Sequence, residues 1–243
     1  MRVALLLGLL GVVTSSAAAG FESVSSGHGR IEVCAAGVRL SLRGGWGGGG
    51  GASAVKEPVT GINFPGNLQA GGKSLELLGC GERRKKIVGP VAVNVYAIGM
   101  YVDQGPASAA GKGVSGEAAA AKALSDGSFT KSLRLVMARS VNAEKIGDAL
   151  AEQIEPRVKG TGAPVDEFKG FFKGLEKLEN QQVVIFTQTG STLAVSAPGN
   201  RSSQFNSAPL CKALFDIYLG DKPVSDNAKN AMVSGFLKLC GGK

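Results

Sequence analysis

The sequence predicts an α+β domain in which an antiparallel sheet carries its helices on one face. Strand patterns dominate the chain between about residues 54 and 140, amphipathic helix patterns gather later, and short turns join consecutive strands. The chain has 243 residues, of which 44% are hydrophobic. It is therefore long enough for one sizeable domain with a continuous core.

The first strands are predicted at residues 58–64 and 75–79, with a turn at Gly71-Gly72 between them. The strongest strand pattern covers residues 88–103, where β-branched and aromatic residues lie between two Gly-Pro pairs. Residues 107–128 are mostly Ala, Gly and Ser, which predicts a surface excursion with a single helical turn.

The second half predicts one more strand, a β-hairpin and four helices. A strand is expected at 131–140, and the hairpin joins 182–188 to 192–197 around Gly190. The helices are expected at 142–154, 166–178, 207–220 and 225–239. Asn142, Ser207 and Ser225 begin three of these helices, because their side chains can accept hydrogen bonds from the free N–H groups of the first turn.

The first 53 residues resemble a targeting leader. Residues 1–20 combine Arg2 with a short apolar run and small residues, which predicts a signal peptide. Residues 21–53 are rich in Ser, Gly and Arg and poor in acidic residues, which predicts a transit-peptide-like, disordered segment before the domain at 54–243. Such a pair resembles the bipartite plastid leaders of algae, so the plastid stroma is expected. Simple secretion is the alternative.

Cysteine, histidine and charge patterns exclude several classes of site. The domain holds only Cys80, Cys211 and Cys240, without the spacing of a disulfide framework or a zinc site, although one bridge with a free thiol stays open. The only histidine, His28, lies in the predicted leader, so the domain offers no His-based catalysis or metal site.

The net charge is +8, but basic residues alternate with acidic ones, and the cluster at 83–86 lacks interleaved aromatic residues. We therefore expect no nucleic-acid partner and no metal or cofactor. The N-terminal apolar run is too short to span a bilayer, so no stable membrane insertion is expected.

Several segments resemble the chalcone isomerase family. Residues 77–83 and 95–103 are similar to the signature strands of that family, and 205–207, 210–220 and 223–225 are similar to its C-terminal stretch. The resemblance covers nearly all of residues 56–239. It implies an open-faced β-sandwich, with a large antiparallel sheet, a layer of helices and a ligand cleft between them.

Departures from the family pattern bear on function. In catalytic members an arginine, a threonine, a tyrosine and an asparagine orient the substrate; here the resemblance places Arg83, Tyr96, Asn142 and Ala149 at these positions. The polar groups that would stabilise developing charge are therefore incomplete, and no catalytic residue is predicted.

The pair of Arg83 and Tyr96 resembles the non-catalytic, fatty-acid-binding branch of the family. The resemblance implies that this pair holds the carboxylate of a free fatty acid while the acyl chain lies in the cleft. Three alternatives stay open: an exposed basic turn at Arg83, a chalcone-flavanone isomerase, and a non-catalytic helper of flavonoid synthesis. The sequence assigns neither the acyl length nor the oligomeric state.

Overall fold

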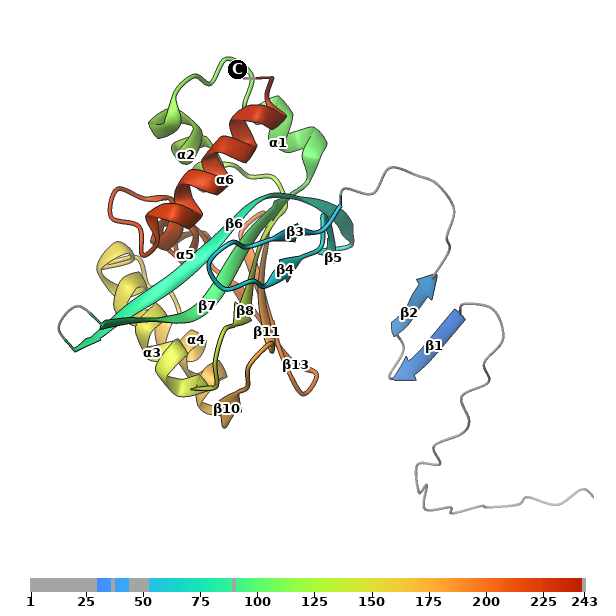
Figure 1. Cartoon of the computed structure of the whole chain (residues 1–243), viewed down its shortest axis with the longest axis vertical. Helices are drawn as coiled ribbons and strands as arrows, with labels where there is room; N and C mark the ends of the chain where they lie inside the picture. The colour runs from blue at the N-terminus through green and yellow to red at the C-terminus, as the bar shows by residue number, and fades with distance from the viewer. Residues whose placement is uncertain (1–29, 36–37, 44–52, 89–90, 242–243) are drawn as a thin grey trace, which may run out of the picture. The chain divides into compact units, whose positions relative to one another are not determined.

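The computed structural model describes residues 30–35, 38–43, 53–88 and 91–241 (Figure 1). The chain divides into two compact units, residues 1–49 and 50–243. In the first unit, strands β1 (Arg30–Ala35) and β2 (Val38–Arg43) pair antiparallel, a hairpin that the sequence analysis does not predict. The predicted signal peptide, residues 1–20, lies outside the described residues.

The second unit is built on a seven-stranded antiparallel sheet. The strands follow one another across the sheet in chain order, which is the arrangement that short connections favour. They are β5 (Asn67–Ala70), β6 (Lys73–Val88), β7 (Val91–Val102), β8 (Lys131–Met137), β11 (Val183–Thr189), β12 (Thr192–Ala197) and β13 (Arg201–Asn206). Two short pairs stand apart from it: β3 (Val55–Lys56) with β4 (Asn63–Phe64), and β9 (Val141–Asn142) with β10 (Lys177–Leu178).

The helices lie between and after these strands. They are α1 (Gln104–Ala110), α2 (Glu117–Asp126), α3 (Ala143–Ile154), the 3₁₀ turn η1 (Glu155–Arg157), α4 (Val165–Lys173), α5 (Ala208–Leu219) and α6 (Asp226–Leu239). Asn142, Ser207 and Ser225 cap α3, α5 and α6 by accepting a backbone N–H, so these three predicted starts are confirmed. Among the described helices, none is long and apolar enough to cross a membrane.

Alternation along β7 shows how the sheet separates two cores. Tyr96, Ile98 and Met100 belong to the large core beneath the helices. Ala97 and Tyr101 face the opposite side, where a small cluster is covered by Phe64 and its neighbours. Successive strand residues point to opposite faces, so the helix layer covers one face. The predicted α+β architecture, an open-faced β-sandwich with one layer of helices, is confirmed.

Glycines allow α6 to lie directly on β6 (Figure 1). A Cβ atom at Gly81 would come within 2.6 Å of the Ala228 Cα atom, and one at Gly79 would meet the carbonyl of Ala231. Both glycines lie within the 16-residue strand β6. They serve close packing of helix on strand rather than flexibility at a strand end.

Several predicted boundaries are wrong. β6 continues to Val88, so Arg83 belongs to a strand and not to an exposed turn. Residues 107–128 contain most of α1 and all of α2 instead of one helical turn, because an Ala-rich segment forms helix without a strong apolar stripe. The helix predicted at 166–178, which is α4, ends at Lys173. The polar strand β13 was missed because it lacks hydrophobic alternation.

Candidate ligand-binding site

A cavity of about 450 Å³ opens between the β6–β7 hairpin and helix α3. In Figure 1 this hairpin extends alongside α3. Much of the cavity wall is apolar, with contributions from β7, α3, α5 and the segment after α5. The apolar side chains are Val93, Val95, Ile146, Leu150, Ile217 and Val224. Such a wall, with a few polar groups converging on it, is typical of small-molecule sites.

The structure brings Arg83 and Tyr96 together in this cavity. The two residues are direct partners in the antiparallel register of β6 and β7, and both line the cavity. Directly opposite residues of paired strands share one face of the sheet. A cation and a phenol predicted to act together therefore lie side by side beneath the helix layer.

Most hydrogen-bonding capacity of the Arg83 guanidinium is unused. Its Nη1 atom donates to the backbone carbonyl of Arg84 at 2.5 Å, and the guanidinium lies close enough to Tyr96 to oppose the rise in the pKa of that phenol through its charge and a hydrogen bond. No ion pair to Arg83 occurs among them either. A guanidinium carries five N–H donors, so this one can still receive an anion.

Tyr96 is supported from behind by a second tyrosine. The phenol oxygens of Tyr96 and Tyr218 lie 2.8 Å apart, and the two side chains are 5% and 0% exposed. Burial raises the pKa of both phenols, and the nearby charge of Arg83 opposes this shift. Both rings therefore stay protonated at neutral pH and can act as hydrogen-bond donors.

Sequence reasoning missed Tyr218. This residue lies on α5, where eight of twelve residues are buried, so helical periodicity does not distinguish Tyr218 from core residues. Its stretch is predicted as a helix and resembles the C-terminal stretch of the family, but no role is assigned to Tyr218. A hydroxyl among the apolar residues of the buried face of α5 is the one signal that could have found it, since buried phenols usually have partners.

Comparison with known protein families shows to which family this chain belongs. A sequence model described as chalcone isomerase-like matches residues 56–234. The chain belongs to the chalcone isomerase-like family. The match begins in β3, covers all seven strands of the large sheet and reaches into α6, so it includes Arg83, Tyr96 and Tyr218.

Relatives in this family carry names that refer to fatty-acid binding. Fatty-acid-binding protein 1 of Arabidopsis thaliana is 28% identical over 202 residues, covering 76% of this chain and 71% of the relative. Fatty-acid-binding protein 2 of the same plant is 28% identical over 208 residues, covering 76% of this chain and 52% of the relative. A crystal structure of Arabidopsis fatty-acid-binding protein 1 matches with a TM-score of 0.68 and 24% identity, covering 77% and 99% of the two chains.

Two positions, the cap of α3 and a residue within that helix, separate this chalcone isomerase-like chain from the catalytic pattern. Asn142 and Ala149 line the cavity where catalytic members are expected to carry tyrosine and asparagine. The Asn142 side chain accepts the Lys145 N–H at 3.4 Å as the cap of α3, and Ala149 offers only a methyl group. The helix side of the cavity therefore lacks the expected polar pair.

Among the residues that the structure describes, no cluster of His, Cys, Asp or Glu could hold a metal ion. Cys80, Cys211 and Cys240 are all free. Burial raises the pKa of the Cys80 and Cys211 thiols to about 11, so neither is a ready nucleophile at neutral pH.

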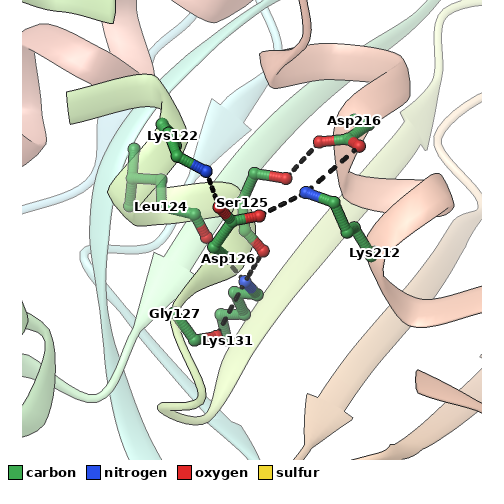
Figure 2. Close-up of polar contacts among 8 residues, drawn as sticks. All are labelled: Lys122, Leu124, Ser125, Asp126, Gly127, Lys131, Lys212 and Asp216. Atoms are coloured by element: carbon green, nitrogen blue, oxygen red, sulfur yellow. Dashed lines mark hydrogen bonds and ion pairs between the residues drawn. The ribbon is translucent and has the colours of Figure 1, made fainter. Parts of the chain in front are cut away.

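A second cation, Lys131, is buried away from the cavity (Figure 2). Its Nζ atom donates to the backbone carbonyls of Leu124 at 2.6 Å, Ser125 at 2.7 Å and Gly127 at 3.0 Å, at the end of α2. Nζ also lies 4.8 Å from the centre of the Phe215 ring. Burial lowers the pKa of Lys131 to about 8.

An ion-pair network lies beside Lys131, between α2 and α5. Asp126 accepts hydrogen bonds from Lys122 and Lys212, while Lys212 also approaches Asp216 at 3.5 Å (Figure 2). These cations already have anionic partners within the protein. The network therefore joins α2 to α5 and leaves little charge for a ligand.

Proposed function

We propose that this protein binds a free fatty acid without transforming it. Arg83 and Tyr96 hold the carboxylate, and the acyl chain lies against the apolar wall of the cavity. The observation that carries the proposal is the pairing of Arg83, which forms no ion pair among the described residues, with the protonated phenol of Tyr96 in the lining of a cavity whose wall is largely apolar. The names of two relatives in the family support the same ligand class.

The headgroup chemistry follows from the donors that face the cavity. A guanidinium meets both oxygens of a carboxylate through parallel charge-assisted hydrogen bonds. Tyr96 adds a hydroxyl donor from the neighbouring strand. When Tyr218 donates to the Tyr96 oxygen, the Tyr96 proton is free for the ligand, and the chain of hydrogen bonds strengthens each member.

The acyl chain supplies most of the remaining affinity. Each buried methylene contributes about 0.8 kcal/mol. Valine, isoleucine and leucine side chains line the wall beside Tyr96, so a chain extending from the headgroup meets apolar surface. The ordering of a flexible chain on binding offsets part of this gain.

The same arrangement argues against catalysis by this protein. A cyclisation needs groups that stabilise developing charge on the substrate. On the helix side, Asn142 is engaged in capping α3 and Ala149 has no polar group. A chalcone assay should therefore show consumption no faster than the spontaneous reaction, and clear acceleration would contradict the carrier proposal.

The proposal includes the cellular compartment in which the protein acts. The Ser-rich and Gly-rich leader predicted before residue 54 supports the plastid stroma. Fusion of residues 1–53 to a fluorescent protein, expressed in an alga with a complex plastid, tests this directly. Fluorescence in the secretory pathway or the medium would contradict it.

Ligand binding is tested by comparing acids with neutral analogues. Mass spectrometry of the full chain after expression in bacteria should detect a bound fatty acid. Calorimetric titration should then show that a fatty acid binds at least tenfold tighter than the alcohol of equal chain length, because only the acid carries a carboxylate. Equal affinity for acid and alcohol, or no binding of either, would overturn the proposed site.

A further inference from the structure

Three exposed cations surround the mouth of the cavity. Lys85 lies on β6, Arg139 follows β8, and Lys145 lies in the first turns of α3; all three line the cavity and are exposed to solvent. We call these residues the basic rim. Arg83 lies deeper, is partly buried, and is not part of the rim.

The cations of the basic rim outnumber the carboxylates of the cavity lining. Ion pairs elsewhere join lysines to carboxylates, as in Lys73 with Asp103 and Lys169 with Asp148. Within the described part of the chain, no rim residue forms such a pair. The cavity lining contains four cationic side chains and a single carboxylate, that of Glu152. The mouth is therefore positively charged.

The mouth is also partly apolar. Val93, Val95 and Val141 are only partly buried, and Ala149 on α3 is exposed. Cations interleaved with exposed apolar groups are typical of surfaces that rest on a lipid bilayer, where the cations meet anionic headgroups. An acidic protein would complement the charge but would not explain an apolar cavity that opens at the same place.

We propose that the basic rim docks the protein, mouth first, on an anionic lipid surface, so that a fatty acid passes between bilayer and cavity without crossing water. The transfer step rests on the proposed function, whereas the docking step does not. Each rim cation near an anionic bilayer strengthens membrane partitioning about fivefold. Three cations together should strengthen it by roughly two orders of magnitude at low ionic strength.

Docking is tested with the full chain and no fatty acid. Vesicle flotation compares phosphatidylcholine vesicles with vesicles that also contain phosphatidylglycerol. The variants are K85E/R139E/K145E and a control of equal charge change, K112E/K173E/K238E, whose lysines are exposed and lie outside the cavity lining. The wild type should bind only the anionic vesicles, and added salt should weaken this binding.

The rim variant should lose anionic-vesicle binding by at least 100-fold, because each substitution replaces an attractive charge with a repulsive one, and the control should lose less than tenfold. Equal losses in the two variants would overturn the proposal, because net charge alone would then explain binding. Binding of a soluble acidic protein through the rim, with no binding to vesicles, would also overturn it in favour of a protein partner.

Transfer is measured separately, as the rate at which a fluorescent fatty acid moves from the loaded protein to vesicles. Direct transfer predicts a rate that rises with vesicle concentration and with phosphatidylglycerol content. A rate that depends on neither would mean release through water and would overturn the transfer step. If the protein binds vesicles through the rim but binds no fatty acid in solution, the proposed function fails while docking stands.

Discussion

Arg83 and Lys131 are both strand cations beneath the helix layer, yet they have opposite surroundings. Lys131 has three N–H donors and three backbone carbonyls that accept them. Arg83 has five donors and one backbone acceptor, and it lines an open cavity. This contrast indicates that a cation whose donors are all satisfied within the protein stabilises the folded structure. A cation whose donors remain free is available to a ligand.

From this comparison we expect substitutions of Lys131 and Arg83 to change different properties, folding stability in one case and ligand affinity in the other. Loss of Lys131 should cost stability and spare affinity, because its partners lie at the end of α2 and none of them lines the cavity. Loss of Arg83 should have the reverse effect. Four measurements test this contrast, and they are given in order of decreasing expected effect.

Lys131→Met should have the largest effect on folding. The methionine fills similar space but leaves the three carbonyls of Leu124, Ser125 and Gly127 without their donor. Urea denaturation should show a loss of about 3 kcal/mol in the free energy of unfolding. Fatty-acid affinity, measured where the variant is folded, should stay within twofold. A large loss of fatty-acid affinity without a loss of stability would contradict the structural role assigned to Lys131.

Arg83→Ala should have the largest effect on binding. Removal of the bidentate charge-assisted contact should weaken fatty-acid affinity by about 100-fold, or roughly 3 kcal/mol, measured by calorimetry. The free energy of unfolding should change by less than about 0.5 kcal/mol, because Arg83 is only partly buried and unpaired.

Arg84→Ala is the matched control for this substitution. Arg84 is the next residue of β6, is exposed, and does not line the ligand cavity. Its loss should leave fatty-acid affinity within twofold. Equal weakening by Arg83→Ala and Arg84→Ala would indicate a general charge effect instead of a headgroup site.

The pH dependence of the free energy of unfolding tests whether burial disfavours the protonated form of Lys131. The pKa of Lys131 falls from 10.5 to about 8 on folding, so between these values the unfolded chain binds more protons than the folded one. Stability of the wild type relative to Lys131→Met should therefore rise with pH in this range, by roughly 1.4 kcal/mol for each pH unit. If the difference in unfolding free energy between the wild type and Lys131→Met stayed constant or fell between pH 8 and pH 10, the environment described for Lys131 would be contradicted.

Tyr218→Phe should have the smallest effect. It removes one hydroxyl behind Tyr96 while keeping the ring, so fatty-acid affinity should fall by about fivefold, or roughly 1 kcal/mol. Tyr101→Phe is the control, since its hydroxyl donates to the Pro65 carbonyl at 2.9 Å on the opposite face of the sheet. That variant should leave affinity unchanged. Affinity for the fatty alcohol separates a role in orienting Tyr96 from loss of packing, because packing defects weaken both ligands.

Local signals predicted much of the fold. The caps at Asn142, Ser207 and Ser225 were found because a capping side chain acts within three residues of itself. The hairpin of β11 and β12 was found because Gly190 marks its turn, where the backbone φ angle is 58°. Features set by distant contacts, such as the edge strand β13, were not found.

The site was harder to predict than the fold. The strand pairing of Arg83 with Tyr96 cannot be obtained by counting residues, because β6 shifts register between Leu77 and Gly79 and again after Arg83. Family resemblance supplied the pair instead. Tyr218 was missed because its partner lies 122 residues away in the sequence. The basic rim likewise forms only when β6, β8 and α3 are brought together.

The glycine contact between β6 and α6 determines where the pocket can change. Gly79 and Gly81 share the helix-facing side of β6 with Arg83, since their partners Met100, Ile98 and Tyr96 alternate along β7. At these two glycines the backbone of β6 packs directly against the backbone of α6, so no substitution there can enlarge the space for a ligand. If the protein binds a fatty acid as proposed, changes that retune acyl length must therefore occur on the opposite wall, at positions such as Ile146 and Leu150 of α3.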